Sequence, residues 1–514
     1  MADLENILEA VWSKVRKSHL FPELPPPAWN EGTPRVGLNM TGKKISISRK
    51  FVEEMSLSIN PEEVLEGLLD HAVSHYLYCP WSFVTYLKLY AAAKDSLKDA
   101  NMAQKGTDRF MDVVADSICI SRKETPIPKI YRQLEKSILD ETVYALCQII
   151  WDVDLGVKNT GDVARGLARL PYMDRGSWTE SIRRFVELLQ PFLDMEKDNE
   201  IPAVPPPMGC HSIQQYSAQE IMDGLKALSL DVTSPSDFSE LVHDFEVEIT
   251  EAFESAGNGL GDTSTYALDT DIIYYMKLAE NYLLPIRKVP MQKSGFMYPC
   301  SHVPWEVSRP YQDIDPWTSF GKIMPGITQT WKRVEGEVFG QEEGIPDCIV
   351  IIDSSGSMQN PKHSLSYAVL GAACACDTYL RNDARVAVYN FGDAAAGGRQ
   401  VLAYSRCRKE IYESLCCYFG GGTHFQVEDI QSLQNEGAPD IFLISDMQIT
   451  NLEILIQYLN AYQNRVTAVH IGDNESVRKF RFGLDLRKNI SIYDVKKIED
   501  IPRIVLGKIR QYLC

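Results

Sequence analysis

Two stretches of this sequence carry oxygen or nitrogen side chains at spacings that suit a bound metal ion. In the first, Asp353, Ser355 and Ser357 alternate along a single turn. A carboxylate and two hydroxyls are hard donors, which suit a hard cation such as Mg²⁺. The turn follows the apolar run 348–352, a pattern typical of a buried parallel strand. Ligands of open α/β sheets bind where such strands end, so the sequence predicts a cation site there, with a plain Ser-rich turn as the alternative.

Two later stretches can complete this site. Thr423 follows three glycines, which allow the backbone of a loop to approach another chain segment closely. Asp446 ends a second apolar run, 440–446. If the two apolar runs form neighbouring strands, these side chains converge on one rim with the turn at 353–357. A near-octahedral Mg²⁺ ion would then keep a position for water or for the carboxylate of a partner.

The second stretch is a pair of histidines, His71 and His75, on a predicted helix. The helix is signalled by a candidate N-cap before Pro61, and it must end before Pro80. Residues four apart lie on one helix face, a spacing that suits two ligands of one Zn²⁺ ion. An acidic residue of the next predicted helix, 107–122, can supply a third ligand. The alternative is two histidines that only cap or pack.

The elements around these stretches fall into two patterns. Residues 36–48 alternate around a Thr-Gly turn and predict a β-hairpin ahead of the histidine helix. From residue 346 onward strands and helices alternate, which predicts a doubly wound, mainly parallel α/β sheet covered on both faces. Its expected strands are 348–353, 384–391, 399–404, 440–446, 465–471 and 490–495. Its expected helices are 361–381, 408–418, 451–463 and 499–512.

The remaining segments predict a three-part chain. Residues 1–200 form a mostly helical α+β domain, and 201–300 form an acidic, helical and Pro/Gly-rich connector that begins at a proline-rich boundary. The acidic part of this connector, 217–254, is expected to be solvated. Residues 301–514 form the α/β domain. It is preceded by an ordered proline- and aromatic-rich strap, with a possible edge strand at 327–337.

Composition excludes several classes of function. The 514-residue chain has a net charge of −18, whereas nucleic-acid binding and anionic membrane surfaces require a basic face. It contains no run of about 18 apolar residues, so no membrane span is predicted. The acidic N-terminus does not resemble a signal peptide, and the twelve cysteines are scattered. These features predict a cytoplasmic protein with reduced cysteines.

Residues 35–122 resemble the zincin metallopeptidase fold, in which a hairpin precedes a helix with two histidines and a later helix carries an Ala-Asp pair. On this resemblance His71, His75 and Asp116 would hold Zn²⁺. The zincin motif is HExxH, but here Ala72 replaces the glutamate. A methyl group cannot take a proton from a zinc-bound water. The resemblance therefore implies a former peptidase scaffold that retains a metal site.

The C-terminal motifs resemble the metal-ion-dependent adhesion site of von Willebrand factor A domains, in the same order and over about residues 345–514. The implied ligands are Asp353, Ser355, Ser357, Thr423 and Asp446. The pattern departs from the family at the Met-Gln pair after the aspartate, where glycine is frequent. The resemblance implies bound Mg²⁺, with Mn²⁺ or Ca²⁺ as substitutes, and a protein partner whose acidic side chain completes the coordination.

Together these observations predict a metal-dependent protein-binding adaptor. A zincin-like part followed by a von Willebrand A domain resembles proteins that work with MoxR-type AAA+ ATPases. The sequence has no GxxxxGK[ST] loop, so the ATPase would be the partner. One alternative is a zinc peptidase with an unusual base. Another is a cell-surface adhesion protein, which the acidic N-terminus and scattered cysteines disfavour.

Overall fold

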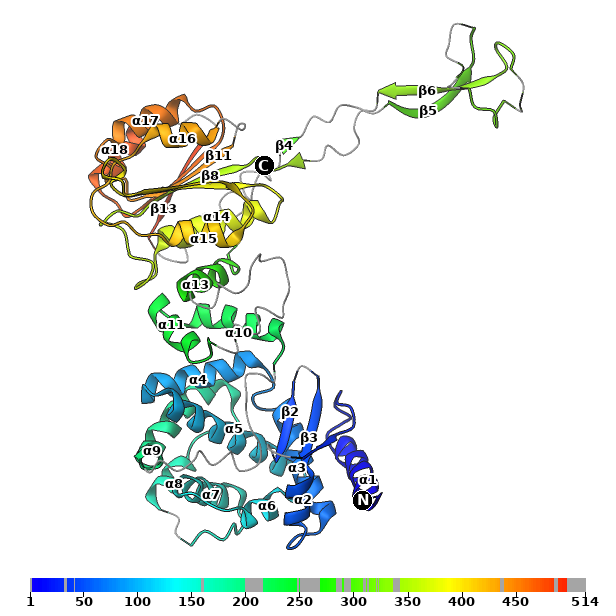
Figure 1. Cartoon of the computed structure of the whole chain (residues 1–514), viewed down its shortest axis with the longest axis vertical. Helices are drawn as coiled ribbons and strands as arrows, with labels where there is room; N and C mark the ends of the chain where they lie inside the picture. Colours follow the sequence, from blue (N-terminus) through cyan, green and yellow to red (C-terminus); the bar gives the residue numbers. More distant parts are fainter. Residues whose placement is uncertain are drawn as a thin grey trace. The chain divides into compact units, whose positions relative to one another are not determined.

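The chain divides into two compact units, each built from several segments (Figure 1). Unit 1 comprises Met1–Tyr282, Gln359–Ala373 and Cys407–Tyr418, and unit 2 comprises Leu283–Met358, Cys374–Arg406 and Phe419–Cys514. The computed structural model describes residues 2–31, 35–40, 42–158, 161–198, 216–246, 249, 269–282, 289–290, 297–307, 311, 314–319, 321, 323–335, 343–434, 439–484 and 489–496. The three-part division at residues 200 and 300 stays a prediction.

Unit 1 is mostly helical, as predicted, and it carries one small sheet with strand order β1-β3-β2. Its strands are β1 (Ala28–Asn30), β2 (Val36–Asn39) and β3 (Lys44–Ser48). Its first nine helices are α1 (Ala2–Ser18), α2 (Arg49–Met55), α3 (Pro61–Leu77), α4 (Phe83–Leu97), α5 (Ala100–Arg122), α6 (Ile127–Gln133), α7 (Ile138–Trp151), α8 (Asp162–Leu167) and α9 (Trp178–Asp198). The predicted hairpin is the antiparallel pair β2 and β3.

Helix α3 begins and ends where its sequence signals predict. The Asn60 side chain accepts a hydrogen bond from the Glu62 backbone N–H at 3.0 Å, and Pro61 is the first helical residue. The carboxylate of Glu63, in the first turn, pairs with Lys129 at 2.6 Å. Helix α5 begins seven residues earlier than expected, because the Asp99 side chain caps it.

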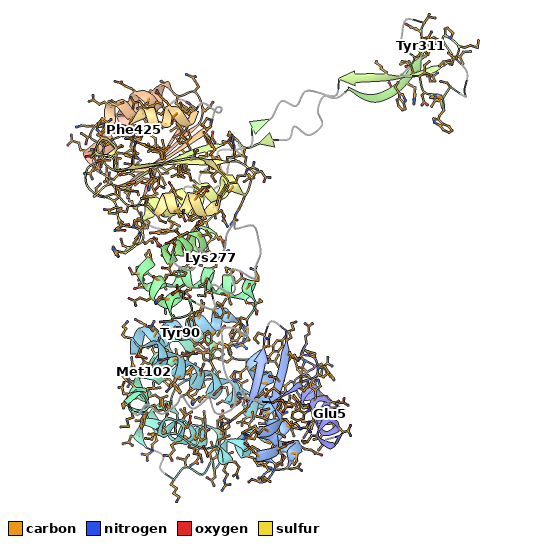
Figure 2. The ribbon with its side chains drawn as sticks, in the orientation of Figure 1. Glu5, Tyr90, Met102, Lys277, Tyr311 and Phe425 are labelled. Carbon is orange, nitrogen blue, oxygen red and sulfur yellow. The ribbon has the colours of Figure 1, made fainter. Side chains whose placement is uncertain are left out.

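The acidic middle segment is packed rather than solvated where the structure describes it. It forms α10 (Ala218–Asp231), α11 (Pro235–His243) and α13 (Thr270–Ala279). The buried face of α10 rests on α4, and a Cβ added at Gly224 would lie 2.4 Å from the Phe83 ring. Tyr90 of α4 donates a hydrogen bond to the Asp244 carboxylate at 2.7 Å (Figure 2). In these acidic helices, burial of the apolar stripe stabilises packing more strongly than the charged residues favour exposure to water.

Unit 2 contains a six-stranded mixed sheet with the order β10-β9-β8-β11-β12-β13, in which only β10 is antiparallel to its neighbour. The strands are β8 (Cys348–Asp353), β9 (Val386–Phe391), β10 (Arg399–Ser405), β11 (Asp440–Ser445), β12 (Val466–Ile471) and β13 (Ile490–Val495). Strands β8 and β11 are parallel neighbours, so the carboxyl ends of the two apolar runs meet. The mainly parallel sheet is confirmed.

Helices cover both faces of this sheet (Figure 1). Side chains of α16 (Val427–Leu433), α17 (Leu452–Ala461) and α18 (Glu475–Gly483) share one buried cluster with the strands. Helix α14 (Tyr367–Leu380) lies on the other side, where its Tyr379 hydroxyl donates to Asp440 at 2.7 Å. Helices α16 and α18 were not anticipated from the sequence. The expected last helix, 499–512, lies outside the described residues.

The proline- and aromatic-rich segment differs from the expected edge strand. Strands β5 (Met297–Pro304) and β6 (Gln329–Glu335) pair antiparallel with each other, and the described strands of the main sheet do not include them. Trp305 is buried here beside Tyr311, with ring centroids 5.2 Å apart (Figure 2). A second small pair joins β4 (Val289–Pro290) to β7 (Glu343–Gly344). The strand predicted at 327–337 is therefore present as β6, but its partner could not be predicted, because alternation identifies a strand and not its neighbour.

Helix α15 (Arg408–Cys416) completes the helices of unit 1. Among the described residues, no helix combines the length and the apolar character needed to cross a bilayer. The nine cysteines whose side chains the structure describes are all free thiols.

Candidate metal centres

Helices α3 and α5 bring two histidines and one aspartate together in the core of unit 1. The Nε2 atoms of His71 and His75 lie 3.2 Å apart. The Asp112 Oδ1 atom lies 3.3 Å from His75 Nε2 and 4.0 Å from His71 Nε2. A point about 2.1 Å from all three atoms satisfies these separations, which matches the Zn–N and Zn–O bond lengths of about 2.0–2.2 Å. The three residues therefore fit one zinc ion.

The hydrogen bonds of the two Nδ1 atoms orient the rings so that the two Nε2 atoms face each other. His71 Nδ1 lies 2.9 Å from the Asp116 carboxylate, and His75 Nδ1 lies 2.6 Å from the Cys79 carbonyl oxygen. Because these oxygens only accept, each Nδ1 donates its proton and each Nε2 of a neutral ring presents a lone pair. Two lone pairs and a carboxylate oxygen thus converge on one point. That arrangement requires a cation, either a shared proton or a metal.

Charge around the cluster also favours a cation. Four aspartates near the cluster are at least nine-tenths buried: Asp108, Asp112 and Asp116 of α5, and Asp140 of α7. Arg109 of α5 is a buried cation. Arg109 pairs with Asp140 at 2.9 Å. Buried charges are stable only when they are paired or bound to a metal. Burial lowers the pKa of His71, but the Asp116 contact and the Asp112 charge outweigh it, so the net pKa is raised.

The predicted third ligand, Asp116, and its neighbour Asp112 one turn away lie on opposite sides of the His71 ring. Asp116 lies on the Nδ1 side of His71, where it orients the ring, and its second oxygen accepts from Tyr131 at 2.7 Å. Asp112 supplies the oxygen on the Nε2 side. The sequence marked both aspartates but could not tell them apart, because both lie on one face of α5. No spacing signal identified Tyr131, which comes from α6.

This cluster is closed to solvent. His71, His75 and Asp112 are 1%, 5% and 2% exposed, and Ala72, at the position of the zincin glutamate, is 2% exposed. A catalytic zinc site keeps an open position for water, whereas a structural site does not. The donor set and the burial therefore fit a structural ion that joins α3 to α5.

A second buried group, His19, Asp70 and Cys119, has a different character. Asp70 accepts from His19 Nε2 at 3.1 Å and from Lys123 Nζ at 2.7 Å, while its other oxygen accepts from Thr125 at 2.6 Å. The lysine ammonium already balances the carboxylate and would repel a metal ion. Burial raises the pKa of the Cys119 thiol to about 12, which keeps it protonated. This group is an ion-pair network.

In unit 2 the Asp353 turn forms as the sequence predicts. The Asp353 carboxylate accepts from the Ser355 backbone N–H at 3.0 Å and from the Ser445 hydroxyl at 2.6 Å. The hydroxyls of Ser355 and Ser357 lie 3.2 Å apart. Two of the three predicted oxygen donors therefore adjoin each other directly, and the third is held by both the turn and strand β11.

The glycine loop is joined to this turn by two backbone hydrogen bonds. Gly420 N donates to Ser354 O at 2.9 Å, and Gly356 N donates to Gly421 O at 3.0 Å. A Cβ at Gly356 would lie 3.0 Å from the Gly421 carbonyl oxygen, so the contact requires glycine. Gly421 itself has φ +71°, in the left-handed region. Thr423, two residues further on, is buried, and its carbonyl accepts from Thr450 at 2.9 Å.

Asp446 follows β11 directly and is 6% exposed. Burial and the Asp446 charge both raise the pKa of Asp353, although hydrogen bonds from Ser445 and Ser355 oppose them, and the result is about 6. Because these two buried carboxylates repel each other, a cation between them would stabilise both. The donor set, two carboxylates and three hydroxyls, contains only hard oxygens. The residues present therefore fit Mg²⁺.

Comparison with known proteins adds one structural similarity. The sequence matches no protein-family model and no curated protein. Among solved structures, the crystal structure of the SpRpn10 VWA domain is similar to part of this chain, at 14% identity and a TM-score of 0.26. The alignment covers 32% of this chain and 95% of that domain.

Proposed function

We propose that this protein is a metal-dependent protein-binding adaptor whose working site is a Mg²⁺ ion at the carboxyl edge of the unit 2 sheet. Asp353, Ser355 and Ser357 would hold the ion, with Thr423 and Asp446 completing a site of the von Willebrand A type. The observation that carries the proposal is the pairing of the Asp353 turn with the glycine loop through Gly356 and Gly421. That pairing assembles donors from separate strands before any ligand binds.

The protein residues would orient and restrain the site rather than perform a reaction. The Ser355 backbone N–H and the Ser445 hydroxyl fix the plane of the Asp353 carboxylate. The glycine loop limits movement of the turn, so little entropy is lost on binding. A bound Mg²⁺ ion would supply an electrophilic position for a carboxylate of the partner. Recognition would therefore require an acidic side chain on the partner and would depend on the metal.

The partner class is inferred from the resemblance of the sequence motifs. A zincin-like part followed by a von Willebrand A domain suits a cytoplasmic protein that links a MoxR-type AAA+ ATPase to a client. The ATPase would supply the hydrolysis of ATP, because the sequence lacks a phosphate-binding GxxxxGK[ST] loop. This assignment is an analogy at the level of domain architecture.

In unit 1 we propose a structural Zn²⁺ ion held by His71, His75 and Asp112. Asp116 and the Cys79 carbonyl would orient the two rings, as outer partners of zinc-bound histidines do. The alternative function, a zinc-dependent peptidase, would require a base beside a metal-bound water. Ala72 offers no such group, and the burial of the cluster leaves a peptide no path to it.

Affinity purification of the full-length chain with and without Mg²⁺ tests the adaptor proposal. We expect an AAA+ ATPase to be captured only with Mg²⁺, and Asp353→Ala to abolish the capture. Glu453→Ala, which removes an exposed carboxylate from α17, serves as the matched control and should capture the ATPase normally. Equal capture by wild type and Asp353→Ala would refute binding through this site.

A further inference from the structure

The carboxylate of Asp446 is held by a residue that the adhesion-site motif does not include. Gln448 donates to it twice, from its backbone N–H to Oδ1 and from its side-chain Nε2 to Oδ2, each at 2.9 Å. Each carboxylate oxygen therefore already accepts one hydrogen bond from the same residue. Gln448 itself is exposed, so its side-chain amide exchanges a bond to water for this contact.

The turn between these two residues explains why the glutamine folds back. Met447 has φ +61°, an uncommon left-handed conformation for a residue with a side chain. Its side chain is fully buried in the core cluster, and its backbone N–H donates to the Ser445 hydroxyl at 2.8 Å. These contacts hold the reversal in place, and the next residue is directed back toward Asp446.

The same hydroxyl connects the reversal to the other carboxylate of the site. Ser445 accepts from Met447 N–H and donates to Asp353 at 2.6 Å. The two carboxylate oxygens of Asp353 are thus held by one hydroxyl and one backbone N–H. The two carboxylates differ in one respect: only Asp446 is held by a solvent-exposed side chain, that of Gln448.

We propose that Gln448 is a latch that competes with the metal ion for Asp446. This inference rests on the proposed Mg²⁺ site. While the amide remains bonded, the Oδ2 atom of Asp446 shares its charge between the amide and the ion, so Asp446 holds the ion less strongly. The ion is then less neutralised by the protein, so it attracts the carboxylate of a partner more strongly. Gln448 is thus a positioning residue. It lowers the affinity of the site for Mg²⁺ alone and makes tight binding depend more on the partner.

Titration of Mg²⁺ by calorimetry into the full-length protein, and of Mn²⁺ followed by electron paramagnetic resonance, tests the latch. Gln448→Met keeps the length of the side chain but removes the Nε2 donor, and Gln448→Ala removes the whole side chain. Both variants should bind Mg²⁺ roughly threefold to tenfold more tightly, the range expected for release of one ordinary hydrogen bond at an exposed position. Gln463→Ala, which removes an exposed glutamine from the same unit, is the matched control.

Four results separate the possibilities. Tighter Mg²⁺ binding by both Gln448 variants, with the metal-free Tm and the control unchanged, supports the latch. Unchanged or weaker binding by both variants, while Asp353→Ala abolishes binding, overturns the latch and leaves the proposed site intact. Failure of the wild type to bind Mg²⁺ overturns the proposed site and the latch together. A drop in the metal-free Tm of the variants without tighter binding would assign Gln448 a purely structural role and also overturn the latch.

Discussion

The two histidines of unit 1 illustrate how a hydrogen bond on one side of a ring determines the chemistry on the other. With both Nδ1 atoms donating, the Nε2 lone pairs and Asp112 need a cation between them. Asp112→Asn removes the one anionic ligand, and we expect the zinc content of the purified protein to fall below one ion per ten chains. Elemental analysis by mass spectrometry measures this directly.

Asp116→Asn provides the comparison within the same helix. It keeps all three proposed ligands but weakens the orienting bond to His71, so zinc should remain bound with about 10–100-fold lower affinity. Competition with a chromophoric chelator measures that loss. Asp70→Asn, in the neighbouring ion-pair network, should lower stability without changing the zinc content. Equal zinc content in Asp112→Asn and wild type would exclude Asp112 as a ligand.

Restoring the zincin glutamate should not restore a peptidase. Ala72 is 2% exposed, so Ala72→Glu would place a carboxylate in the core next to other buried acids. We expect the free energy of unfolding to fall by about 3 kcal/mol or more and no peptide hydrolysis to appear. Thermal unfolding and a peptide-library assay check both outcomes. Ala10→Glu, on the exposed face of α1, should leave stability nearly unchanged. A stable, hydrolytic Ala72→Glu protein would revive the peptidase alternative.

The turn after β8 depends on a close approach between two loops. Gly356→Ala would bring a methyl group 3.0 Å from the Gly421 carbonyl oxygen and 3.2 Å from its nitrogen, so one loop must move. We expect Mg²⁺ to bind at least about tenfold more weakly and stability to fall by about 1–3 kcal/mol. Calorimetric titration and chemical denaturation measure the two effects. Gly161→Ala, where a Cβ meets nothing within 4 Å, is the control. Unchanged Mg²⁺ affinity in Gly356→Ala would show that the loop pairing does not shape the site.

The elements that the sequence predicted well are those with local signals. Helix α3 has a side-chain cap and a proline at its start, and strands β8 and β11 are short apolar runs that end in polar turns. Their neighbourhood in the sheet was a condition of the prediction, and the structure meets it. Candidate metal ligands could be predicted from the sequence because a parallel sheet brings such turns to one edge.

The elements that the sequence missed are those decided by tertiary packing. Asp112 and Asp116 have the same spacing relative to the apolar stripe of α5, and only the position of α3 across it determines which one reaches Nε2. Strand β6 was identified as a strand, but its partner β5 could not be. The sequence marked Gln448 only as part of a departure from the family pattern, because its contact with Asp446 depends on the left-handed backbone of Met447.

Taken as a whole, the chain is interleaved, since it passes five times between the two units. Helix α13 shows the consequence for stability. The hydroxyl of its fully buried Tyr275 accepts from Ser366 N–H at 2.8 Å and donates to the Ser364 carbonyl at 3.3 Å, both far along the sequence but within unit 1. The N-terminal 282 residues therefore do not contain all of their own core.

A fragment of residues 1–282 tests this interleaving. It lacks 359–373 and 407–418, so the face of α13 that these segments cover should be exposed to water. We expect the fragment to bind a hydrophobic dye and to show fast amide exchange in α13, whereas the full-length protein should do neither. Tyr275→Phe in the full-length chain is the milder control and should cost about 1–2 kcal/mol. If the α13 amides of the fragment were protected from exchange, α13 would not depend on segments 359–373 and 407–418 for its cover.

The same interleaving imposes a waiting time during synthesis. A ribosome that has completed α13 must add about 140 more residues to complete the 407–418 segment, which takes roughly 7–28 seconds at about 5–20 residues per second. Throughout that interval a helix rich in Ile and Tyr lacks part of its cover. A nascent chain stalled in this window should be a preferred substrate for chaperones that bind apolar segments. One stalled a few tens of residues beyond residue 418 should already be released from them.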